Sequence, residues 1–576
     1  MARIVWKDLL TGQKAQFIAD TLNESLFNYA FDSNKVPSLN LHFFCMDYLS
    51  TYNSVEEGIM QDGNMQPLNE EFEYIVNQSP WLPANISPSI MLFRNKQGYY
   101  KDIQKESNLE TKTKAAYYKE SANYIIQLLS SDNSYLHQLL CKIRAIFDSS
   151  TFTITERAEL YFCVREFCSE LISLGYSKEH LYNRVRKKLF AKRTSTDDIR
   201  LIMDFLESLI AKRVEYDVVF GISDAVYAEF KDLIKGVREA SDEEKRRLTV
   251  NYVIETTRKS LDPVSALHQS KKGFWMLINI HNACIHNNNM QITCNGLVKN
   301  TTATQWNFIN DSVNLLTKTQ NKTKEERLHW TQIAVNRKAD RTMLNALSLH
   351  NNALKTEEPQ TQLLTLWTIF EVLIDTKQNF MSRSNYLTNS LCSILCNSYY
   401  SHVLETLYSQ IALSKTVKSA ILTESRGSNP VEKLAYILKD NCTLQATILT
   451  ALNDYPLEAY KFEHYTTVFS SKEKMLSNLN RHSNRLRWQI MRIYRNRCMI
   501  VHNGKNLPYI DSILENLHYY VDEVFNYIFS KIDIGIDDVE AIFSHARIKE
   551  SSNIKILEDK KNAITDDEYH SIIFDY

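Results

Sequence analysis

A histidine follows closely spaced arginines near the carboxyl end of the chain, in residues 492–504. Arg497 precedes His502 by five residues, and Arg495 precedes it by seven. An imidazole can give or take a proton near neutral pH, and a guanidinium group stays charged and offers forked donors that match phosphate oxygens. RNA cleavage needs a base for the 2′-hydroxyl, an acid for the leaving oxygen and a cation for the transition-state charge. An arginine and a histidine could therefore perform phosphodiester chemistry without a metal.

The residues around this pair predict a helix that ends just after His502. Residues 486–501 contain neither Gly nor Pro. Apolar residues recur there at roughly helical spacing, namely Leu486, Ile490, Ile493, Met499 and Ile500. Asn503 and Gly504 can take the left-handed conformation that ends a helix. His502 is therefore expected in the last turn.

The positions of the arginines around this helix decide which of them could work with His502. At about 100° per residue, Arg495 and His502 share a face, whereas Arg497 and His502 lie on different faces. A site made from Arg497 and His502 would need the helix to loosen near Asn503, or a second copy of the chain across a two-fold axis. Alternatively, the arginines form a solvated surface and His502 is a favourable charge at the helix C-terminus.

Residues 494–504 resemble the signature of HEPN domains, in particular the Apea-like group, in which an Arg and a His separated by a few variable residues precede a Gly-bearing turn. Residues 363–373 are similar to the first long helix of that group, which carries a Trp and a Glu about one turn apart, here Trp367 and Glu371. The resemblance covers roughly residues 340–535. It implies a helical bundle that forms a homodimer and, when catalytic, cleaves RNA without a metal or other cofactor.

The resemblance assigns roles to particular residues. Arg497 and His502 are the motif pair, with His502 as general base or acid and Arg497, alone or with Arg495, stabilising the phosphorane. Glu371 and Asn496 would support them. Cys498 stands where a polar Asn or Asp commonly follows the arginine, so Arg495 or Asn496 could fill the role under a longer spacing.

Glu371 lies one turn after Trp367 on the apolar side of its helix. A buried carboxylate needs a partner. We expect Arg495 or Arg497 to be that partner, with Glu371 orienting the guanidinium group. The alternative is an exposed Glu at the edge of the apolar stripe.

Three functions follow from these residues. The first is a metal-independent endoribonuclease that cleaves RNA, tRNA included, in bacterial anti-phage defence by abortive infection, after a phage-derived trigger. The second is a catalytically inactive HEPN module that dimerises or binds nucleotide or RNA. The third is RNA binding by a basic cluster at the end of a predicted helix, comprising Arg184, Arg186, Lys187 and Lys188, with Lys192 and Arg193 beyond them. That cluster also suits a solvated helix end.

Composition narrows the fold class. Gly at 12 and Pro at 10 of 576 residues are far below the usual levels of roughly 7% and 5%, which favours a mainly helical fold. We find neither a P-loop motif nor a dinucleotide-binding glycine motif. The 67 basic and 68 acidic residues nearly cancel, so any RNA contact must come from local patches.

The sequence predicts a cytoplasmic protein without a membrane span or a metal. The amino terminus lacks the apolar core of a signal peptide, and nowhere do 18 apolar residues run together. Cysteines such as Cys163 and Cys168, or Cys392 and Cys396, lie within apolar helical patterns and are expected to fill cores. Cys392 and Cys396 are four apart, but no second pair at zinc spacing follows them.

The chain is expected to form four parts. Residues 1–150 are a mixed α/β region, with strands at 38–45 and 90–93 and a hairpin at 95–98. Residues 151–335 are a middle helical domain with a few strands, one at 214–222. Residues 336–535 are the HEPN-like bundle, with helices at 341–355, 361–376, 386–414, 430–453 and 508–533 around the motif helix. Residues 536–576 are a tail that is either partly disordered or docked on the body.

Overall fold

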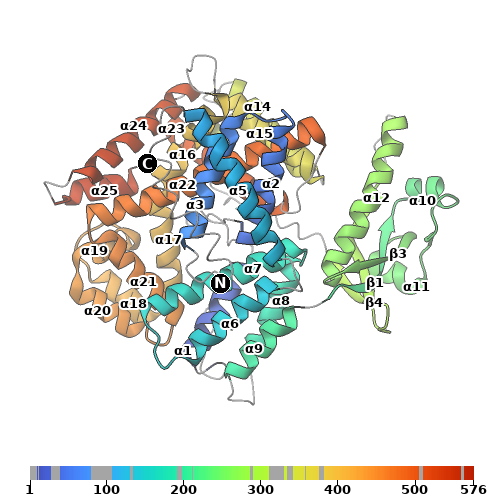
Figure 1. Ribbon diagram of the computed structural model, residues 1–576, viewed down its shortest axis with the longest axis horizontal. Helices are drawn as coiled ribbons and strands as arrows, with labels where there is room; N and C mark the ends of the chain where they lie inside the picture. Colours follow the sequence, from blue (N-terminus) through green and yellow to red (C-terminus); the bar gives the residue numbers. More distant parts are fainter. Residues whose placement is uncertain are drawn as a thin grey trace. The chain divides into compact units, whose positions relative to one another are not determined.

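The computed structural model describes residues 10, 12–26, 39–78, 107–129, 134–190, 198–210, 212–285, 290–310, 328, 330–333, 341–356, 358–374, 382–504, 510–536, 538–559 and 563–575. In this part the chain is mainly helical with one five-stranded sheet, which confirms the expectation of a mainly helical fold (Figure 1). The chain divides into two compact units. Unit 1 comprises Met1–Thr21, Tyr29–Glu166 and Thr319–Tyr576, and unit 2 comprises Leu22–Asn28 and Phe167–Lys318.

The amino-terminal part of unit 1 is helical wherever it is described. Its elements are α1 (Gln13–Leu26), α2 (Leu41–Glu56), the 3-10 turn η2 (Asp62–Asn64), α3 (Met65–Gln78), α5 (Ser107–Leu129), α6 (Ser134–Asp148) and α7 (Ile154–Leu174), of which α1 and α7 cross the boundary between the units.

The strand predicted at 38–45 is wrong, because residues 41–45 form the first turn of α2. The side chain of Asn40 caps this helix by accepting a hydrogen bond from the backbone N–H of Phe43 at 2.9 Å. Phe44 then packs against Phe72 of α3, with ring centroids 5.8 Å apart. A short apolar run does not distinguish a strand from a buried helix, and here the cap decides. The strand at 90–93 and the hairpin at 95–98 lie outside the described residues.

The carboxyl-terminal part of unit 1 supplies most of its helices. They are α14 (Arg341–Lys355), α15 (Pro359–Leu373), α16 (Arg383–Asn397), α17 (Tyr399–Ile411), α18 (Lys415–Leu422), α19 (Pro430–Asp440), α20 (Cys442–Ala451), α21 (Pro456–Phe469), α22 (Lys472–Asn503), α23 (Ile510–Asp533), α24 (Val539–Glu558) and α25 (Asp566–Phe574). The helix predicted at 341–355 is confirmed. The helices predicted at 386–414 and 430–453 are each two helices, divided at Ser398 and Asn441.

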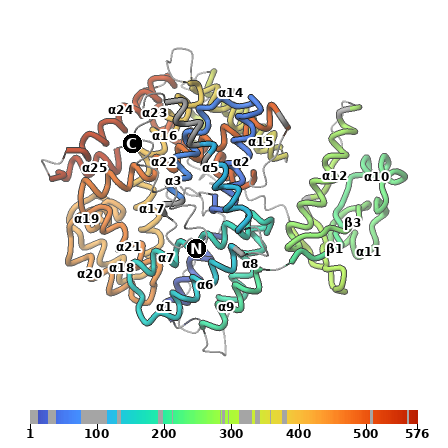
Figure 2. Tube along the Cα trace, viewed as in Figure 1, coloured from blue at the N-terminus to red at the C-terminus, as the bar shows by residue number. Residues whose placement is uncertain are grey.

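The two ends of the chain meet within unit 1. Helix α3 packs against α22, and α2 packs against α3. Figure 2 shows the blue amino-terminal trace of α3 beside the orange trace of α22. Residues from opposite ends of the sequence therefore surround the predicted motif helix.

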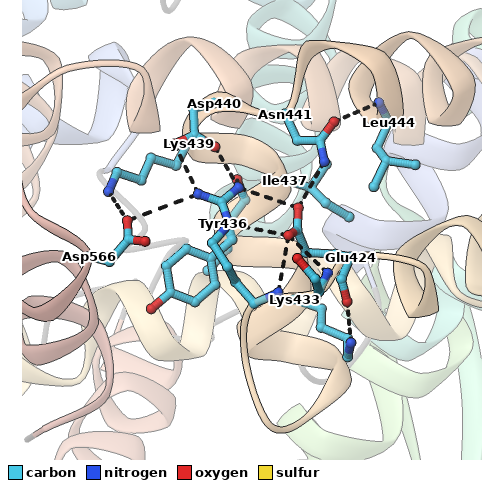
Figure 3. Close-up of polar contacts among 12 residues, drawn as sticks. Glu424, Lys433, Tyr436, Ile437, Lys439, Asp440, Asn441, Leu444 and Asp566 are labelled. Carbon is cyan, nitrogen blue, oxygen red and sulfur yellow. Dashed lines mark hydrogen bonds and ion pairs between the residues drawn. The ribbon is translucent and has the colours of Figure 1, made fainter.

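The tail docks on the helical body, which settles the two alternatives for its described residues. Helix α24 packs against α16 and α22, and α25 packs against α17. Figure 3 shows a polar network that joins α25 to α19 through Asp566, which contacts Lys439. Arg426 Nη2 donates to Asp440 Oδ1 at 2.6 Å, and Arg426 Nε donates to Glu424 Oε1 at 3.2 Å.

Unit 2 contains an antiparallel sheet with the strand order β2-β3-β1-β4-β5. Its strands are β1 (Val214–Ile222), β2 (Val237–Glu239), β3 (Tyr252–Ser260), β4 (Ile292–Asn300) and β5 (Asn307–Asn310), so the strand predicted at 214–222 is confirmed. The helices of this unit are α8 (Lys178–Leu189), α9 (Asp198–Leu209), α10 (Asp224–Phe230), α11 (Asp242–Leu248) and α12 (Pro263–Ile285). Helix α12 packs on the sheet, where Leu267 and Phe274 are buried against Phe220 and Val298.

None of the helices in the described ranges combines the length and apolarity needed to cross a membrane.

Candidate functional site at the end of α22

Helix α22 carries Arg497 and His502, the predicted motif pair. Ser471 caps its start by accepting from the backbone N–H of Lys474. Gly504 ends it in the left-handed conformation at φ 60°, and its N–H donates to the carbonyl of Ile500 at 3.0 Å. The predicted helix end is therefore confirmed, and His502 lies in the last turn.

Two arginines of this helix are fully buried in an ion cluster with carboxylates from the amino-terminal helices. Arg492 Nε lies 3.0 Å from Asp47 Oδ2 of α2, and Arg492 Nη2 lies 2.6 Å from Glu71 Oε2 of α3. Arg495 Nη2 lies 3.3 Å from the same oxygen of Asp47. We call these four residues the buried ion cluster. Since the exposed fractions of its members are 0–3%, the cluster fixes α22 to α2 and α3 out of reach of solvent.

The burial of Arg495 and Asn496 removes both from the surface of this protomer. Asn496 is 2% exposed, and its side-chain amide donates to the carbonyl of Arg492 at 2.9 Å. Arg495 has no exposed side-chain surface. Neither side chain can reach a phosphate in solvent here, so the longer spacing with Arg495 as the motif arginine loses its geometric basis.

Arg497, in contrast, keeps 29% of its side chain exposed and pairs with Glu371 of α15. The distance between Arg497 Nη2 and Glu371 Oε1 is 3.8 Å. Trp367 Nε1 donates to the same carboxylate oxygen at 3.1 Å, which fixes the Glu371 side chain. The expected pairing of Glu371 with one of the two arginines is therefore confirmed, with Arg497 as the partner.

A second cation shares Glu371. Arg383, the first residue of α16, places Nη2 3.9 Å from Glu371 Oε2, and its side chain is 59% exposed. Arg383 could not be predicted from local sequence, because it lies twelve positions from Glu371 in a separate helix. Two guanidinium groups thus lie beside one carboxylate, which leaves an excess of positive charge at this edge of α15 and α22.

Cys498 takes part in apolar packing. It is 8% exposed and forms a small core with Met499 and Met60, against which Tyr494 packs. Burial is the main cause that raises the pKa of the Cys498 thiol, so the side chain is neutral. Tyr494 in turn lies 5.7 Å from the ring of Trp367, which joins α22 to α15. The apolar environment therefore accounts for a cysteine at this position.

His502 lies on the exposed end of α22. Its side chain is exposed, and among the described residues it forms no hydrogen bond or ion pair. Five residues of helix place it roughly 7.5 Å along the axis from Arg497 and about 140° around it. The structure therefore brings Arg497 and His502 to the same end of the helix but not to one face of it.

The basic cluster of α8 lies in unit 2. Lys187 and Lys188 are exposed, whereas Arg184 and Arg186 are half-buried. Arg184 Nη2 donates to Ser208 Oγ at 3.0 Å, and Arg186 lies over the ring of Phe190 at 4.9 Å. The two arginines thus already contact neighbouring side chains, and the lysines form an exposed helix end. Lys192 and Arg193 lie outside the described residues.

The four cysteines expected in cores, Cys163, Cys168, Cys392 and Cys396, are all buried, as predicted. In the described part of the chain, no group of three or more His, Cys, Asp or Glu residues could hold a metal ion.

No protein-family model matches this chain, and neither the curated proteins nor the solved structures contain a match to it.

Proposed function

We propose that the chain is a metal-independent endoribonuclease of the HEPN type, in which Arg497 and His502 act on an RNA phosphodiester. One observation carries the proposal. Of the three arginines at 492, 495 and 497, only Arg497 reaches the surface, held by Glu371 at the same helix end as an exposed histidine. The resemblance of residues 494–504 to the HEPN motif supports the assignment.

In the proposed reaction, neutral His502 removes the proton of a ribose 2′-hydroxyl. The resulting oxygen attacks the adjacent phosphorus, and the bond to the 5′-oxygen of the next nucleotide breaks. That oxygen takes a proton from a second general acid, and the products are a 2′,3′-cyclic phosphate and a free 5′-hydroxyl. Arg497 stabilises the additional negative charge on the phosphorane.

A homodimer would supply what one protomer lacks. The base and the acid need two proton-transfer groups, and a two-fold axis near the end of α22 would bring in a second His502. Val501, apolar and 49% exposed beside His502, would be covered in such a dimer. The dimer would also offset the 140° separation of Arg497 and His502 on a single helix.

RNA cleavage in the presence of EDTA tests the activity. The wild-type chain should cut RNA, and His502→Ala should lower the rate by roughly 100-fold or more, the usual effect of losing a general acid or base. His137→Ala is the matched control because His137 is also an exposed histidine on a helix of unit 1, α6. Activity that is absent in EDTA and returns with magnesium would refute the metal-free mechanism.

The proposed setting, from the same resemblance, is cytoplasmic anti-phage defence by abortive infection, with RNA such as tRNA as the substrate and a phage-derived trigger. Expression of the wild-type chain should then slow bacterial growth, and His502→Ala should relieve the effect at equal protein level. If His502→Ala inhibits growth as strongly as the wild type does, the toxicity does not arise from the proposed site.

A second candidate is a catalytically inactive HEPN module that dimerises or binds nucleotide or RNA. The specific observation in its favour is the apolar packing of Cys498 where related motifs carry a polar side chain. This candidate predicts RNA or self-association without cleavage. Retained association together with no cleavage product in EDTA or magnesium would support it over the nuclease.

A further inference from the structure

A cavity of about 230 Å³ lies inside unit 1, far along α22 from the motif. It is lined by side chains of α7, α17, α21 and α22, together with Tyr74 of α3. Four of its lining residues are basic, namely Arg165, Lys461, Arg481 and Arg485. None of the residues that line it is an Asp or a Glu. In a chain with a net charge of −1, such a concentration of cations indicates an anionic ligand.

The groups in the cavity already respond to this charge. Burial, and then the charge of Arg165 and of Arg481, lowers the pKa of Arg485. Burial and the charge of Arg481 lower the pKa of His464 to about 4. Burial and the charges of Arg485 and Arg481 are among the causes that hold the pKa of His482 well below its usual range. An anion bound here would relieve the mutual repulsion of these groups.

The walls of the cavity are aromatic as well as cationic. The rings of Tyr161 and Tyr460 are inclined by 47° with their centroids 5.8 Å apart, and the guanidinium group of Arg165 lies over the Tyr161 ring at 5.4 Å. Tyr399 stacks on His482 with ring centroids 3.8 Å apart and an interplanar angle of 16°. Flat faces of this kind stack on a nucleobase, whatever its identity.

Two buried polar atoms in the lining have unused hydrogen-bonding capacity. His482 is 4% exposed and Asn478 is 5% exposed. Within the described residues, His482 Nε2 and Asn478 Oδ1 have no hydrogen-bond partner. Leaving a buried polar atom without a hydrogen bond is unfavourable, so such atoms in a cavity wall point to a polar ligand.

We propose that this cavity binds a nucleotide, with its phosphate between Arg481 and Arg485 and its base among the tyrosines. An inorganic anion would bind to the basic side chains but would not stack on the rings. An uncharged aromatic molecule would stack on the rings but would not pair with the basic side chains. The cavity volume lies somewhat below the range of roughly 300–1,000 Å³ that is usual for small-molecule sites, which favours one nucleoside monophosphate over a strand. The site is separate from the motif, because Arg485 and Arg497 are twelve residues apart, or roughly 18 Å of helix.

Isothermal titration calorimetry of the full chain with AMP, GMP, CMP, UMP and inorganic pyrophosphate tests the proposal. At least one nucleotide should bind, more tightly than pyrophosphate by about tenfold. Arg481→Gln and Lys461→Gln should each weaken nucleotide binding by at least about tenfold. Tyr161→Leu should weaken nucleotide binding and leave pyrophosphate binding within about twofold.

Lys474→Gln is the matched control, since Lys474 is an exposed cation on α22 that does not line the cavity. It should bind the nucleotides as the wild type does. Arg481 is itself exposed, so its substitution should leave the unfolding curve unchanged. The proposal is overturned if no nucleotide binds at millimolar concentration, if pyrophosphate binds as tightly as every nucleotide, or if Arg481→Gln and Lys461→Gln both bind as the wild type does. His502→Ala should still bind the nucleotide. The nuclease proposal and the nucleotide-binding proposal can therefore fail independently of each other.

Discussion

At the scale of single residues, Arg492, Arg495 and Arg497 are neighbours on one helix with different surroundings. The first two are neutralised inside the molecule by Asp47 and Glu71, and the third reaches the surface beside Glu371. The difference arises from which partner each guanidinium group meets. A buried ion pair is costly to break, because the remaining charge stays in a medium of low dielectric.

The adjacent acidic residues Glu70 and Glu71 of α3 test this difference. The carboxylate of Glu71 is 3% exposed and pairs with the buried guanidinium group of Arg492. Glu71→Gln removes this charge and should lower the free energy of unfolding by about 3–5 kcal/mol. Glu70 pairs with Arg487, and each side chain is 35% exposed, so Glu70→Gln should cost less than about 1 kcal/mol. Chemical denaturation of both variants measures the two losses. Equal losses would contradict the account of the buried ion cluster.

Glu371→Gln tests whether Glu371 positions Arg497. The variant keeps the hydrogen-bonding shape but loses the charge that holds the guanidinium group, so RNA cleavage should fall by about tenfold. The free energy of unfolding should change by less than about 1 kcal/mol, because the pair is partly exposed. Glu405→Gln, an exposed glutamate on α17, is the control for cleavage rate. Unchanged cleavage in Glu371→Gln would assign Glu371 to packing alone.

The residue pattern was sufficient to predict that Glu371 pairs with Arg495 or Arg497, but it was insufficient to decide which of the two arginines is the partner. The pair follows from a carboxylate on an apolar helix face, which must find a cation. The burial of Arg495 depends on Asp47, which is 448 positions away in the sequence. No local pattern encodes that contact. The cationic cavity was missed for the same reason, because its residues come from five helices.

At the scale of elements, local signals predicted helix ends well and helix breaks poorly. Gly504 ends α22 because it has a positive φ, and Gly175, with φ 110°, follows the end of α7 and precedes α8. The breaks at Ser398 and Asn441 have no Gly or Pro to mark them. The run at 38–45 looked like a strand because its apolar residues alternate in part, whereas burial against α3 favours a helix.

Helix α23 carries a buried histidine that should make stability depend on pH. Burial, with the nearby charge of His350, lowers the pKa of His518 to about 3. In the unfolded chain this imidazole titrates near 6.5, so between about pH 6.5 and pH 3 the unfolded state binds more protons and stability falls with falling pH. From pH 7 to pH 5 the loss from His518 should be about 2 kcal/mol.

His518→Leu should remove that part of the pH dependence. Between pH 7 and pH 5, the free energy of unfolding of this variant should fall by about 2 kcal/mol less than that of the wild type. Denaturation curves at the two pH values measure this difference. His137→Leu, at an exposed position on α6, should keep the wild-type dependence. A pH dependence of His518→Leu identical to that of the wild type would show that His518 is not held neutral.

At the scale of the whole molecule, the compact units do not follow the order of the sequence. The sequence suggested successive parts, but unit 1 contains helices from both ends of the chain. The predicted bundle at 336–535 therefore includes neither Asp47 nor Glu71, which neutralise two of its buried arginines. Hydrophobic periodicity identifies the faces of helices but not which distant helix covers them.

A fragment beginning at residue 341 should therefore fail to fold by itself. It would bury Arg492 and Arg495 without their carboxylates, at a cost of several kcal/mol for each charge. Circular dichroism during heating should show no cooperative transition for residues 341–576. The same fragment with Arg492→Met and Arg495→Met should regain part of the transition. A cooperative transition in the unmodified fragment would contradict the role assigned to α2 and α3.

The chemical identity of the RNA ends produced in EDTA tests the central claim most directly. The account predicts that the wild-type chain, freed of metal, leaves 2′,3′-cyclic phosphate and 5′-hydroxyl ends, and that Arg497→Ala and His502→Ala leave the RNA intact. Products with 3′-hydroxyl and 5′-phosphate ends, or undiminished cutting by His502→Ala, would contradict it.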